Sequence, residues 1–213
     1  MDHYKTPITS FPPRQILMDY FVARSATVMG ETDIRYESPV RYVSFDEVTK
    51  QFTVTFHDYR NNLSTSEIFD YIVCCSGHFS YPFAPSYEGF QNFEGSIIHS
   101  HSIRSALIYR GLNVVIVGTS FSAEDVASLC WKFGAKRIVL SYRNTPMPYH
   151  WPPKVENRPA ISYVEKNECH FVDGSSFTAD AIILCTGYLY HFPFMAQDIK
   201  LVTESSMGWN KNL

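Results

Sequence analysis

Three small residues follow a run of apolar residues near the middle of the chain. Gly118, Ser120 and Ala123 have the spacing of the G-x-G-x-x-G/A turn that binds dinucleotides, with Ser in place of the second glycine. In that turn the first small residue allows a sharp change of direction, the second lets the pyrophosphate approach the backbone, and the third lets helix and strand pack closely. The spacing alone fits an ordinary strand–helix turn equally well, so both interpretations stay open at this point.

A strand and a helix must hold this turn in place. The residues from Val114 to Val117 are all β-branched and apolar, which is typical of a strand buried on both faces. Apolar residues then recur at helical spacing from Val126 to Trp131. Strand, turn and helix form the first half of a βαβ unit, whose helix N-terminus offers amide groups and a partial positive charge to an anion. The candidate cofactor-binding residues of the turn are Gly118, Thr119, Ser120, Phe121, Ser122 and Ala123.

A second apolar run, within residues 136–142, ends next to Arg143 and Asn144. In a dinucleotide-binding fold the end of the second strand faces the adenosine ribose, where an acidic residue selects NAD and an arginine accommodates the 2′-phosphate of NADP. No Asp or Glu lies near Arg143 in the sequence, and the planar guanidinium suits phosphate. We therefore favour an NADP contact over a solvent-exposed loop arginine, and add Arg143 and Asn144 to the candidate cofactor-binding residues.

The bulk composition excludes several classes of function. The chain has 213 residues, 45% of them hydrophobic, and its formal charge of −3 gives no indication of a nucleic-acid or anionic-membrane partner. No apolar run approaches the ~20 residues of a membrane-spanning helix, and the first residues lack the apolar core of a signal peptide. The five cysteines include no C-x-x-C pair, so neither a zinc site nor a dithiol redox centre is indicated. We expect a reducing, cytoplasmic location.

The N-terminal part predicts a helix followed by an antiparallel meander. Ser10 has the side chain of a helix cap, and the apolar residues from Ile16 to Phe21 form one face of a short docked helix. Between residues 32 and 57, apolar and polar residues alternate on both sides of a turn at residues 46–50. We include Val40 among the candidate cofactor-binding residues, although a meander without cofactor contacts fits the pattern equally well.

Two stretches, residues 68–79 and 178–192, repeat one pattern. When Asp70 is aligned with Asp180, each stretch continues as an apolar run with a cysteine and ends in a small hydroxyl residue and a glycine. Such strand ends are expected where a chain leaves a dinucleotide-binding domain and later returns to it. Chance similarity of two buried strands is the alternative, which the shared Asp, Cys and Gly disfavour. The candidate cofactor-binding residues at these ends are Ser76, Gly77, Thr186 and Gly187.

Between the two repeats, Phe93, Gly95 and His99 form an F-x-G-x-x-x-H motif. His99 could orient a cofactor loop or transfer protons near neutral pH. A structural role as a hydrogen-bonding side chain is somewhat more common for such a histidine, and we favour it.

Together these motifs resemble the flavin-containing monooxygenases. The F-x-G-x-x-x-H stretch is similar to the identifying sequence of that family, and the turn at Gly118 resembles the NADP site of its trimethylamine-oxidising members. Residues 142–147, the Trp-Pro pair at 151–152 and the stretch 184–188 resemble further family segments. The motifs occur in the order of the family and cover nearly the whole chain.

The resemblance implies both cofactors and a reaction. In that family NADPH reduces FAD, and the reduced flavin oxygenates a soft nitrogen or sulfur atom of a small-molecule amine or sulfide with O₂, through a flavin hydroperoxide. Because the flavin supplies the chemistry, the protein residues mainly bind and orient. We therefore nominate cofactor-binding residues only, with no catalytic acid or base and no metal ligand.

This chain departs from the family in three ways. Ile103 stands where the family has an aromatic residue, and Phe83 stands where close relatives often have asparagine. No G-x-G precedes residue 114, so the FAD fingerprint is missing. The chain therefore resembles the central part of such an enzyme, and we expect that it does not hold FAD or oxygenate substrates by itself.

We predict an α/β fold with a Rossmann-like parallel sheet. Residues 90–175 should form the NADP-binding domain, residues 1–89 a partial FAD-binding domain with the helix and the meander, and residues 176–213 a return segment to the FAD-binding domain. A non-enzymatic NADP-binding module is the first alternative. A dithiol flavoprotein reductase is the second, and the missing C-x-x-C disfavours it.

Overall fold

The computed structural model of the chain describes residues 12–30 and 33–199. These residues divide into two compact units, one comprising the residues up to Val73 together with 193–199, and the other comprising Cys74–Phe192. Within the described ranges, no helix is both long enough and apolar enough to cross a membrane. The functional assignment of residues 1–89, 90–175 and 176–213 to two cofactor-binding domains stays a prediction.

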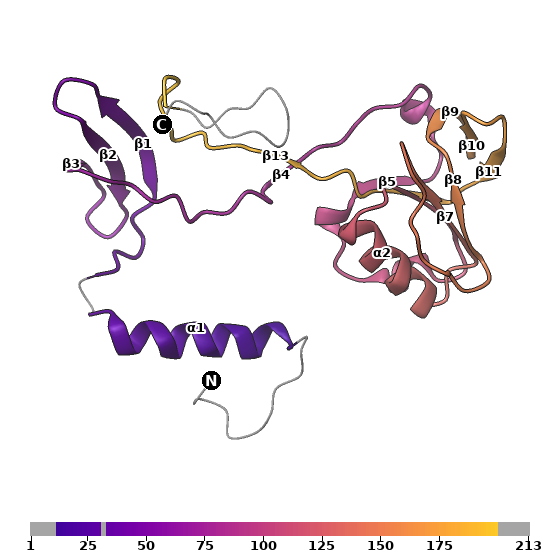
Figure 1. Ribbon diagram of the computed structural model, residues 1–213, viewed down its shortest axis with the longest axis horizontal. Coiled ribbons are helices and arrows are strands. Elements are labelled where there is room, and N and C mark those ends of the chain that lie inside the picture. Colours follow the sequence, from indigo (N-terminus) through magenta and orange to yellow (C-terminus); the bar gives the residue numbers. More distant parts are fainter. Residues whose placement is uncertain (1–11, 31–32, 200–213) are drawn as a thin grey trace. The chain divides into compact units, whose positions relative to one another are not determined.

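A five-stranded parallel sheet forms the centre of the second unit (Figure 1). Its strands follow the order β5-β12-β6-β7-β8, and every neighbouring pair is parallel. The strands are β5 (Ser96–His99), β12 (Ala181–Leu184), β6 (Asn113–Val117), β7 (Arg137–Ser141) and β8 (Val155–Arg158). The predicted α/β fold with a parallel sheet is confirmed. Its second strand, β12, comes from the segment 176–213.

Two different layers cover the two faces of this sheet (Figure 1). Val114 and Ile116 of β6 pack in one cluster with helix α2 (Phe121–Lys132), whereas Val115 and Val117 pack in a second cluster with an antiparallel sheet. That sheet consists of β9 (Ile161–Glu165), β10 (Glu168–Phe171) and β11 (Ser176–Thr178). The alternation of side chains along a strand therefore explains why every residue from 114 to 117 had to be apolar.

Helix α2 packs on the sheet through small and apolar residues. Ala123, Val126, Ala127 and Cys130 are buried, as the helical spacing predicted. Trp131, placed on the same face by the sequence pattern, is 49% exposed, because it lies one residue beyond the buried stripe. The helix ends before Gly134, whose φ of +89° is easily adopted only by glycine.

Short elements complete the second unit. β4 (Tyr81–Pro82) pairs antiparallel with β13 (Tyr188–Leu189) in a two-stranded ribbon. Three 3₁₀ helices connect the longer elements: η1 (Phe90–Asn92), η2 (Ser100–Ser102) and η3 (Ala106–Tyr109).

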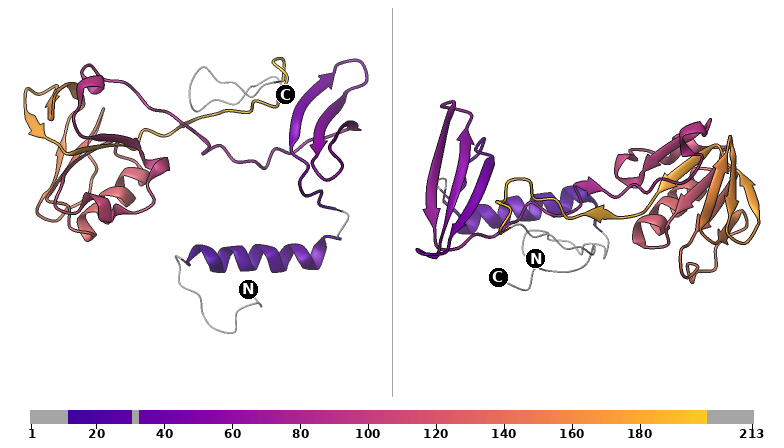
Figure 2. Two further views of the ribbon diagram at one scale, coloured as in Figure 1. Left: turned by 180° about the vertical axis from the view of Figure 1, so that it is seen from behind. Right: turned by 90° about the horizontal axis from the view of Figure 1, so that it is seen from above.

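The first unit contains the predicted meander, shown from two further sides in Figure 2. Its strands are β1 (Val40–Asp46), β2 (Gln51–Asp58) and β3 (Leu63–Phe69), paired antiparallel in that order. The Asp46 carboxylate accepts hydrogen bonds from the backbone amides of Val48 and Thr49 and thereby fixes the turn.

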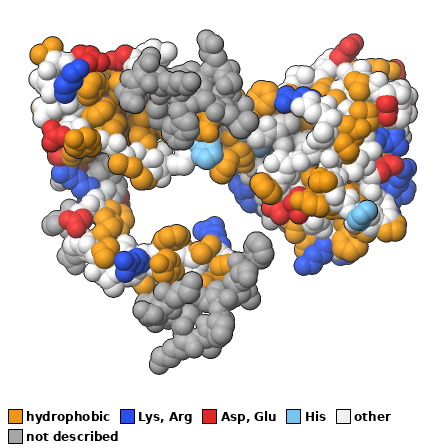
Figure 3. All heavy atoms as spheres, viewed as in Figure 1, with side chains coloured by type: hydrophobic (Ala, Val, Ile, Leu, Met, Phe, Trp, Pro, Cys, Tyr) orange, Lys and Arg blue, Asp and Glu red, His pale blue; other side chains and the backbone are white. Residues whose placement is uncertain are grey.

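Helix α1 (Arg14–Val28) forms where the sequence predicts a helix, but none of its residues is buried. Leu17 and Phe21, expected to dock, are 45% and 64% exposed, and apolar side chains line the helix surface in Figure 3. The expected cap, Ser10, lies outside the described residues.

The apolar run of the first repeated stretch is not a strand beyond Phe69, contrary to the sequence prediction. Residues 70–75 have no regular structure, and Tyr71 and Val73 are 88% and 84% exposed. A strand exists only where neighbouring strands take up its backbone hydrogen bonds. β12 has β5 and β6 on either side, whereas no described strand pairs with residues 70–75.

Candidate dinucleotide-binding site

The turn after β6 depends on Gly118 having no side chain. Its φ is +118°, and a Cβ at this position would lie 2.4 Å from the carbonyl oxygen of Cys185. The amide of Gly118 donates to the Ser141 carbonyl at 2.9 Å, and the amide of Cys185 donates to the Val117 carbonyl at 2.8 Å. The turn is therefore locked between the ends of β7 and β12, and only glycine fits there.

The N-terminus of α2 leaves hydrogen-bond donors free directly after this turn. The amides of Ala123 and Glu124 donate to the Ser120 carbonyl, at 2.8 and 3.1 Å. The Ser120 side chain makes no capping hydrogen bond. Among the described residues nothing accepts from the amides of Phe121 and Ser122. Two backbone donors and one hydroxyl are thus available for an anion at the positive end of the helix dipole.

The remaining residues of the turn differ in exposure. Ala123 is fully buried, so its small side chain allows the helix to approach the sheet closely. Phe121 is 80% exposed. The Thr119 hydroxyl donates to the Thr145 carbonyl over a long distance of 3.4 Å.

Arg143 and Asn144 lie where the sequence predicted them, just beyond the end of β7 and exposed. The Ser141 carbonyl, at the end of β7, accepts a hydrogen bond from the Gly118 amide, so this strand end adjoins the turn. No carboxylate within the described residues pairs with Arg143. Nothing in the sequence pattern pointed to Tyr87. Burial raises the pKa of Tyr87, and the nearby charge of Arg143 offsets part of that rise. Arg143 therefore has a charge available for a ligand, beside an aromatic ring.

The F-x-G-x-x-x-H motif has a structural explanation. A Cβ on Gly95 would lie 2.3 Å from the Asp180 carbonyl and 2.6 Å from the Phe93 ring. His99 is 8% exposed, and its Nδ1 accepts from the His101 amide at 3.1 Å. Nδ1 therefore carries no proton, and Nε2 donates to the Gly187 carbonyl at 3.0 Å. Burial lowers the pKa of His99, which keeps the ring neutral. This geometry fits the structural role favoured above.

The residues nominated outside the Gly118 turn differ in their local surroundings. The Thr186 hydroxyl donates to the Phe83 carbonyl, and the Gly187 carbonyl accepts from both His99 and the Phe83 amide. These groups are thus already bonded within the protein. Ser76 and Gly77 lie in an exposed segment outside any strand. Val40 begins β1 in the first unit and is 42% exposed.

The buried thiols lack the character of a redox centre. Burial raises the pKa of Cys130 to about 11 and the pKa values of Cys169 and Cys185 to about 12, so these groups stay protonated near neutral pH. All five cysteines are free, and the described part of the chain has no metal-binding cluster of three or more His, Cys, Asp or Glu.

The chain is similar to known proteins. Residues 33–147 match the family described as flavin-binding monooxygenase-like. A trimethylamine monooxygenase of Roseovarius nubinhibens is 45% identical over 207 residues, which are 97% of this chain and 46% of that protein. The chain thus spans about half the length of the curated relatives that it matches.

Two solved structures have the same arrangement of elements. The crystal structure of Tmm from a Pelagibacter species is 40% identical, with a TM-score of 0.85, and the match covers 94% of this chain and 45% of that one. The S-allyl-L-cysteine S-oxygenase of Allium sativum is 27% identical, with a TM-score of 0.76 over 94% of this chain and 46% of that one.

Proposed function

Because the chain belongs to the flavin-binding monooxygenase-like family, we propose that it forms the NADP(H)-binding part of an oxygenase for small amines or sulfides. The substrate class follows the relatives, which are a trimethylamine monooxygenase and an S-oxygenase. The observation that carries the NADP(H) assignment is the Gly118 turn with the unpaired amides at the start of α2.

The residues of the turn suit a pyrophosphate. The amides of Phe121 and Ser122 and the Ser120 hydroxyl would donate to phosphate oxygens, and the dipole of α2 favours the negative charge. Gly118 keeps the backbone open to the ligand, and Ala123 keeps the helix close to the sheet. Arg143 would bind the 2′-phosphate, with Thr119 and Asn144 at the rim.

NADPH, when bound, supplies the hydride that reduces a flavin. This chain's contribution is to bind the dinucleotide and to orient it. Of the residues nominated at the strand ends, the Thr186 hydroxyl bonds to Phe83, and the Gly187 carbonyl bonds to His99. We therefore assign no step of the reaction to them, and their role toward FAD stays a prediction.

One experiment tests whether the chain binds NADP(H) and whether it oxygenates substrates by itself. The chain is purified with excess FAD, its visible spectrum is recorded, and O₂ uptake is followed with NADPH and trimethylamine or a thioether. We expect NADP(H) binding without retained flavin. A retained flavin spectrum with substrate-dependent O₂ uptake would place the whole activity in this chain. A chain that binds no NADP(H) would exclude the proposed function.

A further inference from the structure

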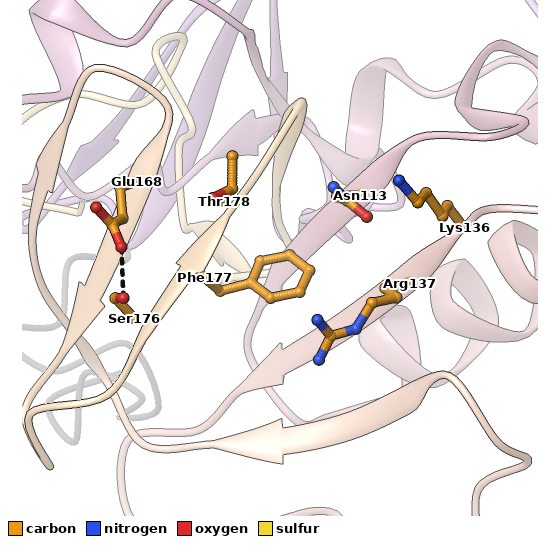
Figure 4. A pocket seen from close by; sticks show the side chains of 7 residues that line it. All are labelled: Asn113, Lys136, Arg137, Glu168, Ser176, Phe177 and Thr178. Atoms are coloured by element: carbon orange, nitrogen blue, oxygen red, sulfur yellow. Dashed lines mark hydrogen bonds between the residues drawn. The ribbon is translucent and has the colours of Figure 1, made fainter.

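A pocket lies at the opposite end of the strands from the Gly118 turn. It measures about 350 Å³ and lies where β6 and β7 begin, beside the hairpin of β10 and β11 (Figure 4). Its lining consists of Asn113, Lys136, Arg137, Glu168, Ser176, Phe177 and Thr178. Dinucleotides bind at the carboxyl ends of parallel strands, so this pocket is separate from the proposed cofactor site.

Phe177 separates two polar walls, as Figure 4 shows. Its ring is 5% exposed and lies 5.0 Å from the guanidinium carbon of Arg137. Arg137 also forms an ion pair with Glu156 at 2.7 Å. Its charge is thus paired with a carboxylate, and its planar face lies against the Phe177 ring. Arg137 and Phe177 therefore form a fixed base for the pocket.

The two remaining charges are not neutralised by each other. Lys136 makes no ion pair within the described chain, and no Lys or Arg there lies within ion-pair distance of Glu168. The Glu168 carboxylate accepts a hydrogen bond from the Ser176 hydroxyl and lies 3.8 Å from His170 Nε2. Figure 4 shows Lys136 and Glu168 on opposite walls. One wall thus carries the ammonium group of Lys136, and the other carries the Glu168 carboxylate, which the Ser176 hydroxyl orients.

We propose that this pocket binds a small zwitterion, whose carboxylate pairs with Lys136 and whose ammonium group pairs with Glu168. The volume is at the lower end of the range for ligand sites, about 300–1,000 Å³, which suits a small molecule. The hydroxyls of Ser176 and Thr178 add hydrogen-bonding groups next to Glu168. Free amino acids and ω-amino acids have this chemistry. The inference does not depend on the proposed oxygenase function.

Calorimetric titration at low salt tests the proposal. The probes are glycine, γ-aminobutyrate and ε-aminohexanoate, which differ in the distance between their charges, together with butyrate and butylamine, which each retain one charge. We expect one zwitterion to bind at least about tenfold more tightly than either singly charged compound, because each retained charge makes its own charge-assisted hydrogen bond.

Matched variants assign the binding to this pocket. Lys136→Gln and Glu168→Gln should each weaken the zwitterion about tenfold or more. Lys136→Gln should leave butylamine unchanged, and Glu168→Gln should leave butyrate unchanged. The controls Lys132→Gln and Glu165→Gln remove exposed charges outside the pocket and should change nothing. Unfolding curves verify that each variant is folded.

Three results would overturn the proposal. The first is that no zwitterion binds, or that none binds more tightly than butyrate and butylamine. The second is zwitterion binding that survives both pocket variants. The third is binding of inorganic phosphate that depends on Lys136 while zwitterions fail to bind, which would make the pocket an anion site.

Discussion

Gly118→Ala is the substitution that the geometry of the turn constrains most strongly. The new methyl group would lie 2.4 Å from the Cys185 carbonyl oxygen and 3.1 Å from its carbonyl carbon, both backbone atoms of a buried strand end. Relieving that overlap costs about 1–3 kcal/mol, as for other overpacked sites. The positive φ adds about 1–3 kcal/mol of backbone strain. We therefore expect a loss of roughly 2–6 kcal/mol in the free energy of unfolding.

Gly111→Ala is the matched control. Gly111 also has a positive φ, +76°, but a Cβ there would meet nothing within 4 Å. The variant should lose about 1–2 kcal/mol, from backbone conformation alone. Both substitutions restrict the unfolded chain equally, so the difference between the two variants reports the overlap with Cys185 together with the greater backbone strain at the φ of +118° of Gly118.

The assay is urea unfolding followed by the fluorescence of Trp131 and Trp151, which belong to the second unit, together with an NADP⁺ titration of each folded variant. Gly118→Ala should also weaken NADP⁺ binding, because shifting the turn displaces the amides at the start of α2. Equal losses of stability in the two glycine variants, or an unchanged NADP⁺ affinity of a folded Gly118→Ala variant, would refute this account of the turn.

Three further predictions concern the same unit. Ala123→Leu should weaken NADP⁺ binding while overpacking costs ~1–3 kcal/mol of stability, and unchanged affinity in a folded variant would argue against the site. Burial lowers the pKa of His99, so the imidazole takes up a proton more readily in the unfolded chain than in the folded one. The free energy of unfolding should therefore fall as the pH drops below about 6.5, and His99→Gln should flatten this pH dependence. A thiol reagent should modify exposed Cys74 and Cys75 in the native protein and the three buried cysteines only after unfolding.

The sequence predicted the centre of the fold because its physical constraints are local. Four consecutive β-branched apolar residues, Val114 to Val117, are typical of a strand that is buried on both faces, and Gly118 indicates the tight turn after it. The spacing of Ala123 and Val126 then defines the buried stripe of α2. These features depend on neighbours within a few residues, so the pattern alone indicated them.

Contacts between distant residues could not be predicted in this way. The run at residues 70–75 resembles β12 in composition, yet β12 alone has strands on both sides. Nothing in the sequence around Gly118 indicates that the Cys185 carbonyl excludes a side chain there. The pairing of His99 with Gly187, 88 residues apart, is likewise visible only in the structure.

The most direct test of the central claim is the dissociation constant of NADP⁺ compared with that of NAD⁺. The parent chain should bind NADP⁺ more tightly, and Arg143→Ala should remove the preference, at a cost of about 1.5–3 kcal/mol for a hydrogen bond to a charged group. Lys132→Ala, which removes a cation from the far end of α2, should leave both constants unchanged. Equal affinities in the parent chain, or a preference that persists in Arg143→Ala, would contradict the account.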